Sequence, residues 1–350
     1  MPYKQLEHLY KSSTSIPIKD VDRFIIISDL HMGNNTRRDD FRKNAKIFET
    51  VLRQHYLPLD YTLILNGDIE ELQKFSLGKI LQRWSNIYTL FKHFDQKGKL
   101  VKIVGNHDAI LPLHHDYFLH KKLYNSLVLK YKSHSLFFFH GHQASNNIEK
   151  YNSLLGFALR YIAKPLGFKN ASTAYNSRRK FRVEKRVYGF SAKNKIVSII
   201  GHTHRPLFDS LSKEDLLKYK IEQLVRLYPQ VDQKEAIEAE MATIKQALKR
   251  ISDHGALERN SLYNSMVVIP CLFNSGCVIG KRGFTAIEIA DGDIQLVYWY
   301  DDRKHQKKMT LYEEGPFPLA GTHYSKLILK KDHLDYIFNK IKLLADCCDQ

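Results

Sequence analysis

Short apolar runs recur along the chain up to residue 204, and each run ends abruptly in a cluster of polar side chains. Runs that are rich in Ile, Val and Phe and that stop at Gly, Asn or Ser are typical of buried β-strands. Amphipathic stretches of helical length, 41–54 and 79–96, separate the early runs. This alternation predicts βαβ units and a largely parallel sheet. The five runs and their clusters are "FIII" before Ser28–His31, "LIL" before Asn66–Asp68, "LVKIV" before Gly105–Asp108, "LFFF" before His140–His142 and "IVSII" before Gly201–His204.

The polar clusters share a chemistry that suits metal ions. Ligands in parallel sheets gather beyond the carboxyl ends of the strands, so these clusters can converge in space although they are far apart in sequence. A mixed nitrogen and oxygen set of this size exceeds the needs of one tetrahedral ion and suits two divalent ions of the Mn, Fe or Zn type. Two such ions can clamp a phosphoryl group and hold a bridging hydroxide. The set comprises Asp29, His31, Asp68, Asn106, His140, His202 and His204.

The composition is that of a soluble globular protein, with 43% hydrophobic and 26% charged residues. The chain offers no run of the ~18 apolar residues that a membrane span requires. Its N-terminus has no apolar signal-peptide core. The four cysteines are too few and too clustered for a disulfide framework. A cytoplasmic location is therefore expected, with peripheral contact to a membrane as a further option.

The net charge of +17 is concentrated in one part of the chain. Residues 149–195 carry 12 Lys or Arg against 2 Asp or Glu, and they directly precede the fifth polar cluster. A local positive field favours anionic partners such as phosphorylated small molecules, nucleic acid or an anionic membrane surface.

The second half of the chain predicts two further features within a single domain of residues 1–350. The stretch 208–262 has mixed charge and many helix-forming residues, with "KEAIEAEMATIKQALKRI" the clearest helix, and it reads as a helical insertion. Strands with tight turns follow between 265 and 300, and they suggest a second, antiparallel sheet packed on the first. An amphipathic helix is expected over 326–350.

The five polar clusters also resemble the ordered motifs of the calcineurin-like metallophosphoesterase family. Its pattern of D-x-H, G-D, G-N-H-D, a lone His and G-H-x-H is present as "DLH", "GD", "GNHD", "HGH" and "GHTH". One such block is weak evidence, whereas five in order at strand ends are strong. The resemblance covers roughly 23–206 and the later strands. It implies an α/β fold with two packed mixed β-sheets flanked by helices, a four-layer αββα sandwich.

The resemblance also implies roles for individual residues. Asp68 would bridge two divalent ions, with Mn expected and Fe or Zn as alternatives, and a hydroxide bridging the ions would attack the phosphorus atom. His107 would stabilise the transition state or protonate the leaving oxygen, and Asp108 would orient its ring. The first ion would be held by Asp29, His31, Asp68 and His204, and the second by Asp68, Asn106, His140 and His202.

Further residues are candidates for substrate contact. The family uses the first histidine of "HGH" as a ligand, so His142 is expected beside the site or on the substrate. Arg37 and Arg38 follow the first cluster and are weaker candidates.

The segment 149–195 resembles the helical lid of the UDP-diacylglucosamine hydrolase branch of the family. Its first part is apolar nearly all round and its second part is basic, which would suit a lipid-linked, phosphorylated substrate. A plain core helix over 153–163 is the alternative. That branch usually carries arginine where this chain has His107, and it lacks an insertion like 208–262. The expected cationic contacts of the lid are Arg178, Arg179 and Arg182.

Three functions remain open from the sequence. The first is a phosphoesterase that hydrolyses a phosphate ester or a pyrophosphate. The second is a nuclease or cyclic-nucleotide phosphodiesterase, which the basic charge favours, although no nucleic-acid-binding module is recognisable. The third is a non-catalytic scaffold on the same fold, which the complete ligand set disfavours.

Overall fold

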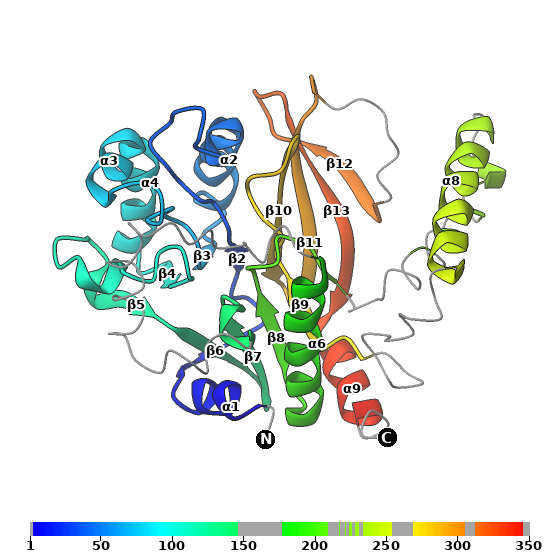
Figure 1. The fold of residues 1–350 in the computed structure, drawn as a ribbon, viewed down its shortest axis with the longest axis horizontal. Helices are drawn as coiled ribbons and strands as arrows, with labels where there is room; N and C mark the ends of the chain where they lie inside the picture. Colours follow the sequence, from blue (N-terminus) through cyan, green and yellow to red (C-terminus); the bar gives the residue numbers. More distant parts are fainter. Residues whose placement is uncertain are drawn as a thin grey trace.

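A computed structural model of the chain describes residues 3–145, 177–208, 234–253, 269–304 and 312–345, and residues 217, 221, 224, 225 and 228–230. Its strands form two mixed sheets that pack face to face, with helices on their outer faces (Figure 1). One hydrophobic cluster combines residues of both sheets, such as Ile64 and Phe138, which is the contact that an αββα sandwich requires. The fold class expected from the resemblance is therefore confirmed.

The larger sheet has eight strands in the order β12-β13-β11-β10-β2-β3-β4-β5. Strands β2 to β5 are parallel, and β10 joins β2 in the antiparallel sense. The strands are β2 (Phe24–Ile27), β3 (Thr62–Asn66), β4 (Leu100–Ile103), β5 (Leu123–Tyr124), β10 (Gly283–Ala290), β11 (Asp293–Asp301), β12 (Glu314–Pro318) and β13 (Tyr324–His333).

The smaller sheet has five strands in the order β1-β6-β7-β8-β9. Only β6 and β7 pair in the antiparallel sense, and the other pairs are parallel. The strands are β1 (Thr14–Ile18), β6 (Ser126–Tyr131), β7 (His134–Phe139), β8 (Val197–Ile200) and β9 (Leu272–Asn274).

Helices complete the layers, and the two amphipathic stretches of the first half form helices as expected. The stretch 41–54 contains η1 (Phe41–Lys43), α2 (Ala45–Val51) and the start of η2 (Leu52–Tyr56), and 79–96 is divided at Trp84. The remaining helices are α1 (Lys4–Lys11), α3 (Leu77–Arg83), α4 (Ser85–Gln96), η3 (Leu111–Leu113), η4 (His120–Lys122), η5 (His142–Ala144), α6 (Ser177–Asn194), η9 (Tyr228–Gln230), α8 (Lys234–Asp253) and α9 (Leu334–Leu344).

Strand β2 shows why an unbroken apolar run is required here. All of its residues are buried, because it lies inside the larger sheet and has apolar layers on both faces. Ile25 and Ile27 pack with the α2 and α4 side, whereas Ile26 points the other way, toward the smaller sheet. The same run positions Asp29 and His31 at its carboxyl end.

The prediction of a second, antiparallel sheet is wrong. The hairpin β10–β11, with its predicted turn at Asp291 and Gly292, extends the first sheet instead. Ile287 of β10 is in register with Ile26 of β2, so the hairpin uses the hydrogen-bonding edge that β2 leaves open. The second sheet is built from strands of the first half together with β8 and β9.

The C-terminal helix is shorter than predicted. Residues 324–333 continue as strand β13, whose buried Leu327 and Ile328 lie beside β11. Helix α9 begins at Leu334, where the ring nitrogen of His333 accepts a hydrogen bond from the backbone of Asp335. Pairing with β11 and β12 thus overrides helix propensity before His333.

The basic half of the expected lid belongs to the core of the sandwich. Val183, Val187 and Phe190 of α6 are buried in the cluster that also contains β8 and β9. Residues 149–176, including the apolar stretch 153–163, lie outside the described residues. Among the described residues, no helix combines the length and the hydropathy needed to cross a bilayer.

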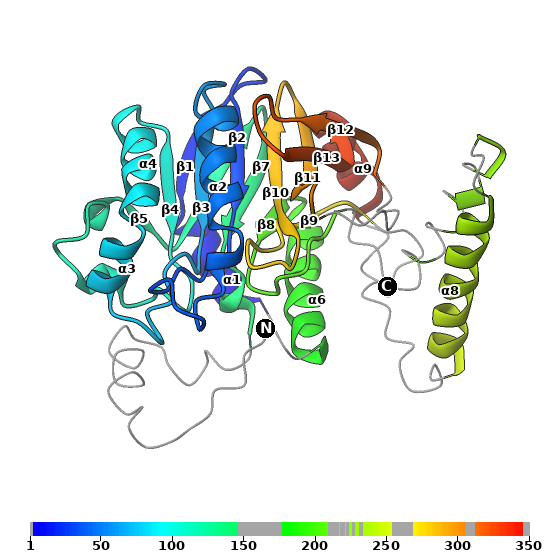
Figure 2. The same ribbon diagram turned by 90° about the horizontal axis from the view of Figure 1, so that it is seen from above.

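The clearest helix of the expected insertion is present as α8, which stands apart from both sheets in the two views (Figure 1, Figure 2). Its Ile237 and Ile244 form a separate small cluster with Leu224. The helix therefore buries its apolar face outside the two main clusters.

Buried Asn66 ties the two sheets together at their carboxyl ends. Its side-chain amide donates hydrogen bonds to the carbonyl oxygens of Phe139 at 3.3 Å and Ile199 at 3.2 Å. The backbone carbonyl oxygen of Asn66 lies 2.9 Å from Nδ1 of His140. One residue of β3 thus contacts both strands that carry site histidines in the smaller sheet.

We predict that Asn66→Leu lowers the free energy of unfolding by about 2–3 kcal/mol, because two buried carbonyls lose their donor. Urea unfolding followed by circular dichroism measures this loss. The control is Asn86→Leu, which removes an exposed hydrogen bond to Glu49 and should cost less than about 0.5 kcal/mol. Equal losses in the two variants would contradict a role for Asn66 between the sheets.

Candidate metal centre

Five loops at the carboxyl ends of strands from both sheets meet in one place. The loops after β2, β3 and β4 come from the larger sheet, and those after β7 and β8 come from the smaller sheet. Five site residues have left-handed backbone conformations, which non-glycine residues rarely adopt and which cluster at functional sites. These residues, with φ between 48 and 63°, are Asp29, His31, Asp68, His202 and His204.

The glycines that precede these residues leave room for the site side chains. A β-carbon on Gly67 would overlap the ring of His140, and one on Gly105 would overlap the side chain of Asp68. A β-carbon on Gly201 would lie 2.6 Å from Oδ2 of Asp29. The repeated Gly in the motifs is therefore explained by close approach between loops.

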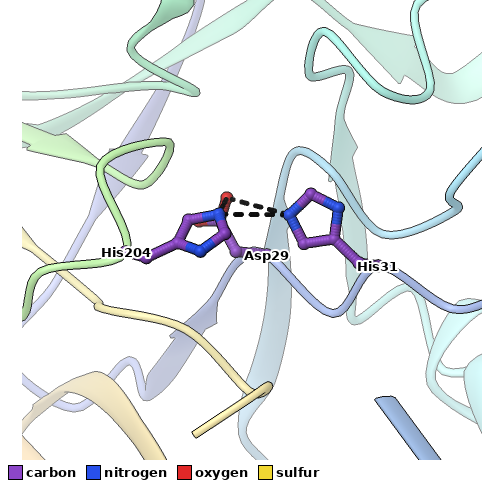
Figure 3. Close-up of side chains that lie close together, drawn as sticks. All are labelled: Asp29, His31 and His204. Carbon is purple, nitrogen blue, oxygen red and sulfur yellow. Dashed lines mark hydrogen bonds and ion pairs between the residues drawn. The ribbon is translucent and has the colours of Figure 1, made fainter. Parts of the chain in front are cut away.

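The first group of candidate ligands contains Asp29, His31 and His204 (Figure 3). Nε2 of His204 lies 3.0 Å from Oδ1 of Asp29 and 3.1 Å from Nε2 of His31. The two rings point toward the same carboxylate oxygen from different loops (Figure 3). His202 and His204 stand at alternate positions after β8, and His204 belongs to this group because its ring faces Asp29.

The second group contains Asp68, His140 and His202, and all three side chains are buried. Nε2 of His140 lies 3.0 Å from Oδ2 of Asp68. His202 and His204 thus belong to different groups, although only Thr203 separates them.

Asp68 lies between the two groups, and with His31 and His107 it forms a third set of possible ligands. Its Oδ2 is 3.0 Å from Nε2 of His140, 3.9 Å from Nε2 of His31 and 4.0 Å from Nε2 of His107. One carboxylate oxygen thus faces imidazoles of both groups, which is the arrangement that a bridging ligand requires.

The second oxygen of each buried aspartate is held by backbone donors. Oδ1 of Asp68 accepts a hydrogen bond from the backbone of His107 at 2.7 Å. Oδ2 of Asp29 accepts from the backbone of His202 at 2.9 Å and from the hydroxyl of Ser28 at 2.5 Å. These bonds orient both carboxylates so that one oxygen of each faces the histidines.

The residues fit a metal ion. Oδ1 of Asp29 and Nε2 of His140 are buried and, among the described residues, make no hydrogen bond of good geometry, although each lies 3.0 Å from a charged or imidazole neighbour. The opposite ring nitrogens face acceptors, because Nδ1 of His140 contacts the carbonyl of Asn66 and Nδ1 of His31 lies 3.1 Å from Glu71. A ring whose Nδ1–H donates to such an acceptor has its Nε2 lone pair available for a metal.

The electrostatics of the centre favour bound positive charge. Burial opposes the charged form of Asp68, but the neighbouring His140 and His107 outweigh it and hold its pKa well below its usual range. Burial opposes the charged ring of His31, yet Asp29 and Glu71 raise its pKa to about 10. Burial likewise opposes the charge of His140, while Asp68 and Asp29 raise its pKa to about 9. The carboxylates therefore stay ionised, and divalent metal ions can supply the positive charge that balances them.

His107 lies at the rim of the centre with 16% of its side chain exposed. Its Nδ1 is 2.8 Å from Glu71, and its ring packs edge-on against His31. The role expected for Asp108 is therefore corrected: Glu71, not Asp108, contacts the ring of His107. Glu71 uses its second oxygen for His31, so it links a candidate ligand to the candidate catalytic residue.

Asp108 instead holds the "GNHD" loop in place from its buried side. Its side chain accepts hydrogen bonds from the backbone of Ile69 at 2.9 Å and of Gly105 at 2.5 Å. It also pairs with Lys102, which is fully buried and 2.5 Å from Glu70. The carboxylate turns inward to this network and is not available to the imidazole.

The other candidate residues of the first half have mixed positions. Asn106 lies at the end of β4, and its backbone carbonyl accepts a hydrogen bond from Gln73. The ring of His142 lies 5.6 Å from that of His140, and burial together with the charge of His140 lowers its pKa to about 3. Arg37 and Arg38 are exposed in the loop after His31.

The arginines of α6 do not enter the centre as a group. Arg179 and Arg182 are exposed, and the side chain of Arg178 lies outside the described part of the structure. Lys180 of α6 is of intermediate exposure; burial lowers its pKa, and the charges of Glu184 and Asp29 act in the opposite direction.

Sequence reasoning missed Asn66 and Glu71. Glu71 stands three residues after Asp68. In the sequence, an acidic residue after a "GD" motif cannot be distinguished from an ordinary surface charge. Asn66 stands before "GD" and reads as the end of a strand. Only the approach of separate loops gives these two residues their roles.

A sequence model of the calcineurin-like phosphoesterase family matches residues 22–221, which is more than half of the chain. No curated protein is significantly similar to the chain. One solved structure that resembles it is a conserved uncharacterized protein of Streptococcus pneumoniae TIGR4, a predicted phosphoesterase. That resemblance has 14% identity and a TM-score of 0.30, and it covers 81% of this chain and 91% of the other.

We predict that Gly201→Ala weakens metal binding by at least about tenfold, because the new β-carbon displaces Asp29 and its partner Ser28. Isothermal titration with Mn²⁺ measures the change. The matched control is Gly78→Ala in α3, where a β-carbon meets no atom within 4 Å and should stabilise the helix by up to about 1 kcal/mol. Unaltered Mn²⁺ affinity in Gly201→Ala would refute the close-approach explanation.

We also predict that Glu71→Gln lowers metal affinity about 10- to 100-fold, because His31 loses the carboxylate that orients it. Asp108→Asn should instead lower the free energy of unfolding by about 2–4 kcal/mol, because Lys102 loses a buried partner. Calorimetric titration and urea unfolding of both variants distinguish these effects. The assignment fails if Asp108→Asn impairs metal binding more than Glu71→Gln does.

Proposed function

Because the chain belongs to the calcineurin-like phosphoesterase family, and is on that ground a metal-dependent phosphoesterase, we propose that it hydrolyses a phosphate ester or pyrophosphate at a dinuclear centre. The proposed ligands of the first ion are Asp29, His31, Asp68 and His204, and those of the second are Asp68, Asn106, His140 and His202. Mn²⁺ is the proposed metal, with Fe or Zn as alternatives.

The position of Asp68 supports this proposal best. Its Oδ2 faces His31 of one group and His140 of the other, whereas its Oδ1 is held by the backbone of His107. A carboxylate oxygen that faces histidines of two groups suits a ligand shared by two ions. With two divalent ions bound, the centre would supply an activated water and positive charge for the phosphoryl oxygens.

The chain's own residues would do the remaining work. His107 is partly exposed beside Asp68, so its Nε2 is available to a phosphoryl or leaving-group oxygen, while Nδ1 is held by Glu71. A protonated ring there would stabilise negative charge or donate a proton to the leaving oxygen. Glu71 is the positioning residue for this ring.

A nuclease or cyclic-nucleotide phosphodiesterase is the second candidate, and the net charge of +17 favours it. A panel of p-nitrophenyl phosphate, its bis-ester, nucleotides, single-stranded DNA and UDP-linked lipids, tested with Mn²⁺, separates these activities. Preference for the bis-ester and DNA over monoesters would favour the second candidate.

We predict that protein loaded with Mn²⁺ binds close to two ions per chain and that Asp68→Ala abolishes turnover, because the bridge between the ions is lost. Metal analysis and hydrolysis of p-nitrophenyl phosphate test the two parts. Full activity of chelator-treated Asp68→Ala protein would disprove the dinuclear mechanism.

We predict that His107→Ala lowers kcat about 10²–10⁴-fold while metal content stays near that of the wild type. The loss should shrink for substrates with very acidic leaving groups, which need little protonation. Loss of metal in step with activity would instead make His107 a ligand. His114→Ala, in the loop after η3, is the control and should retain activity.

A further inference from the structure

Two neighbouring cavities share the residues Lys281 and Arg282, and one of them begins at the metal centre. The nearer cavity, of about 340 Å³, is lined by His204 and by these two cations. The farther cavity, of about 150 Å³, is lined by the same two cations and by side chains around α2 and β11. Tyr298 of the nearer cavity and Asp301 of the farther one point to opposite faces of the larger sheet, so the loop 281–283 separates the two cavities. The nearer cavity is named the groove.

The nearer cavity presents mainly apolar and aromatic surface. Besides His204 it is lined by Pro206 and Tyr298, whereas the ring of Phe284 is buried on the other face of the sheet. Tyr298 stacks with Tyr300 of the same strand, with ring centroids 5.6 Å apart. Such a wall suits a flat or apolar group, since aromatic rings stack favourably on one another.

The farther cavity is strongly cationic. It is lined by six Lys or Arg residues and a single carboxylate, Asp301, which is already engaged by Arg303 through two hydrogen bonds at 2.9 and 2.8 Å. Four of these six cations, those outside residues 301–304, form no ion pair within the described part of the chain. These four are Lys43, Lys46, Lys281 and Arg282.

Buried Asn44 holds the loop that carries Lys281 and Arg282. Its side-chain amide donates to the carbonyl oxygens of Val278 at 2.5 Å and Gly280 at 2.8 Å, and also lies within 3.2 Å of that of Gly283. The same connection begins at the centre, where the backbone of Val278 contacts the carbonyl of Asp29. The two cations are thus presented on a braced loop, which reduces the entropy cost of binding an anion.

We propose that this groove selects the substrate: a phosphoester whose organic part is flat or apolar and carries a second phosphate group. This inference rests on the proposed phosphoesterase activity and adds a substrate class to it. The scissile phosphoryl group lies at the metal centre, the organic part lies along Tyr298, and the second phosphate is bound by Lys281 and Arg282. Phosphate accepts charge-assisted hydrogen bonds from both kinds of cation.

The kinetic test compares adenosine 3′,5′-bisphosphate with adenosine 5′-monophosphate. We expect the double variant Lys281→Ala/Arg282→Ala to raise the ratio of the bisphosphate KM to the monophosphate KM about tenfold or more. Lys43→Ala/Lys46→Ala, on a separate element, should raise the same ratio less. The matched control is Lys79→Ala/Arg83→Ala on exposed positions of α3, which should keep the wild-type ratio. An unchanged ratio in Lys281→Ala/Arg282→Ala overturns the proposal.

A binding measurement separates this proposal from the proposed function. Calorimetric titration of chelator-treated wild-type protein needs no turnover. We expect tighter binding of the bisphosphate than of the monophosphate, with a difference that falls at high salt and disappears in Lys281→Ala/Arg282→Ala. Equal binding of both nucleotides by the wild type overturns the groove. Selective binding without hydrolysis of any phosphoester would refute the enzymatic function and leave the groove standing.

Discussion

Two ionised aspartates buried where the two sheets meet are the constraint on which this structure depends. Asp29 and Asp68 are 0% and 1% exposed, and an unpaired buried carboxylate is too costly to persist. Each is compensated on one side by backbone donors and on the other by imidazoles. The glycines before the ligands and the left-handed residues follow from this, because they allow five loops to approach the two carboxylates closely.

The buried charged residues next to the centre are paired as well. Glu71 holds His31 and His107 together, so a candidate ligand and a candidate proton donor share one support. On the inner side of the same loop, the single cation Lys102 pairs with both Glu70 and Asp108. Tyr88 and Tyr117 donate the remaining hydrogen bonds to Glu70. The "GNHD" loop is thus fixed from two sides by buried charges, and its backbone can orient Asp68 with little freedom to move.

The candidate ligands and the groove proposed to select the substrate lie on different parts of the molecule. The candidate ligands follow β2, β3, β4, β7 and β8, whereas the groove is formed mainly by the loop before β10 and by β11. The link between them is the connection from β9 to β10, which touches the carbonyl of Asp29 and carries Lys281 and Arg282. Loops beyond strand ends can vary without disturbing the sheets, so a common centre can serve different substrates.

The sequence by itself determined the strands that bear the site, their polar ends and the identity of the candidate ligands, because buried strands need continuous apolar runs and metal chemistry needs particular side chains. Local pattern could not decide which strands share a sheet. The hairpin β10–β11 reads the same whether it extends the first sheet or starts a second, and the open edge of β2 settles the matter. The same holds for 324–333, where pairing with β11 gives a strand and not a helix. The partner of His107 was also beyond the sequence, because Asp108 is its neighbour in the chain whereas Glu71 is 36 residues away. Only the packed loops turn Glu71 toward the ring and Asp108 toward Lys102. Tertiary contacts decide such questions because the side chains concerned interact across loops that no local periodicity relates.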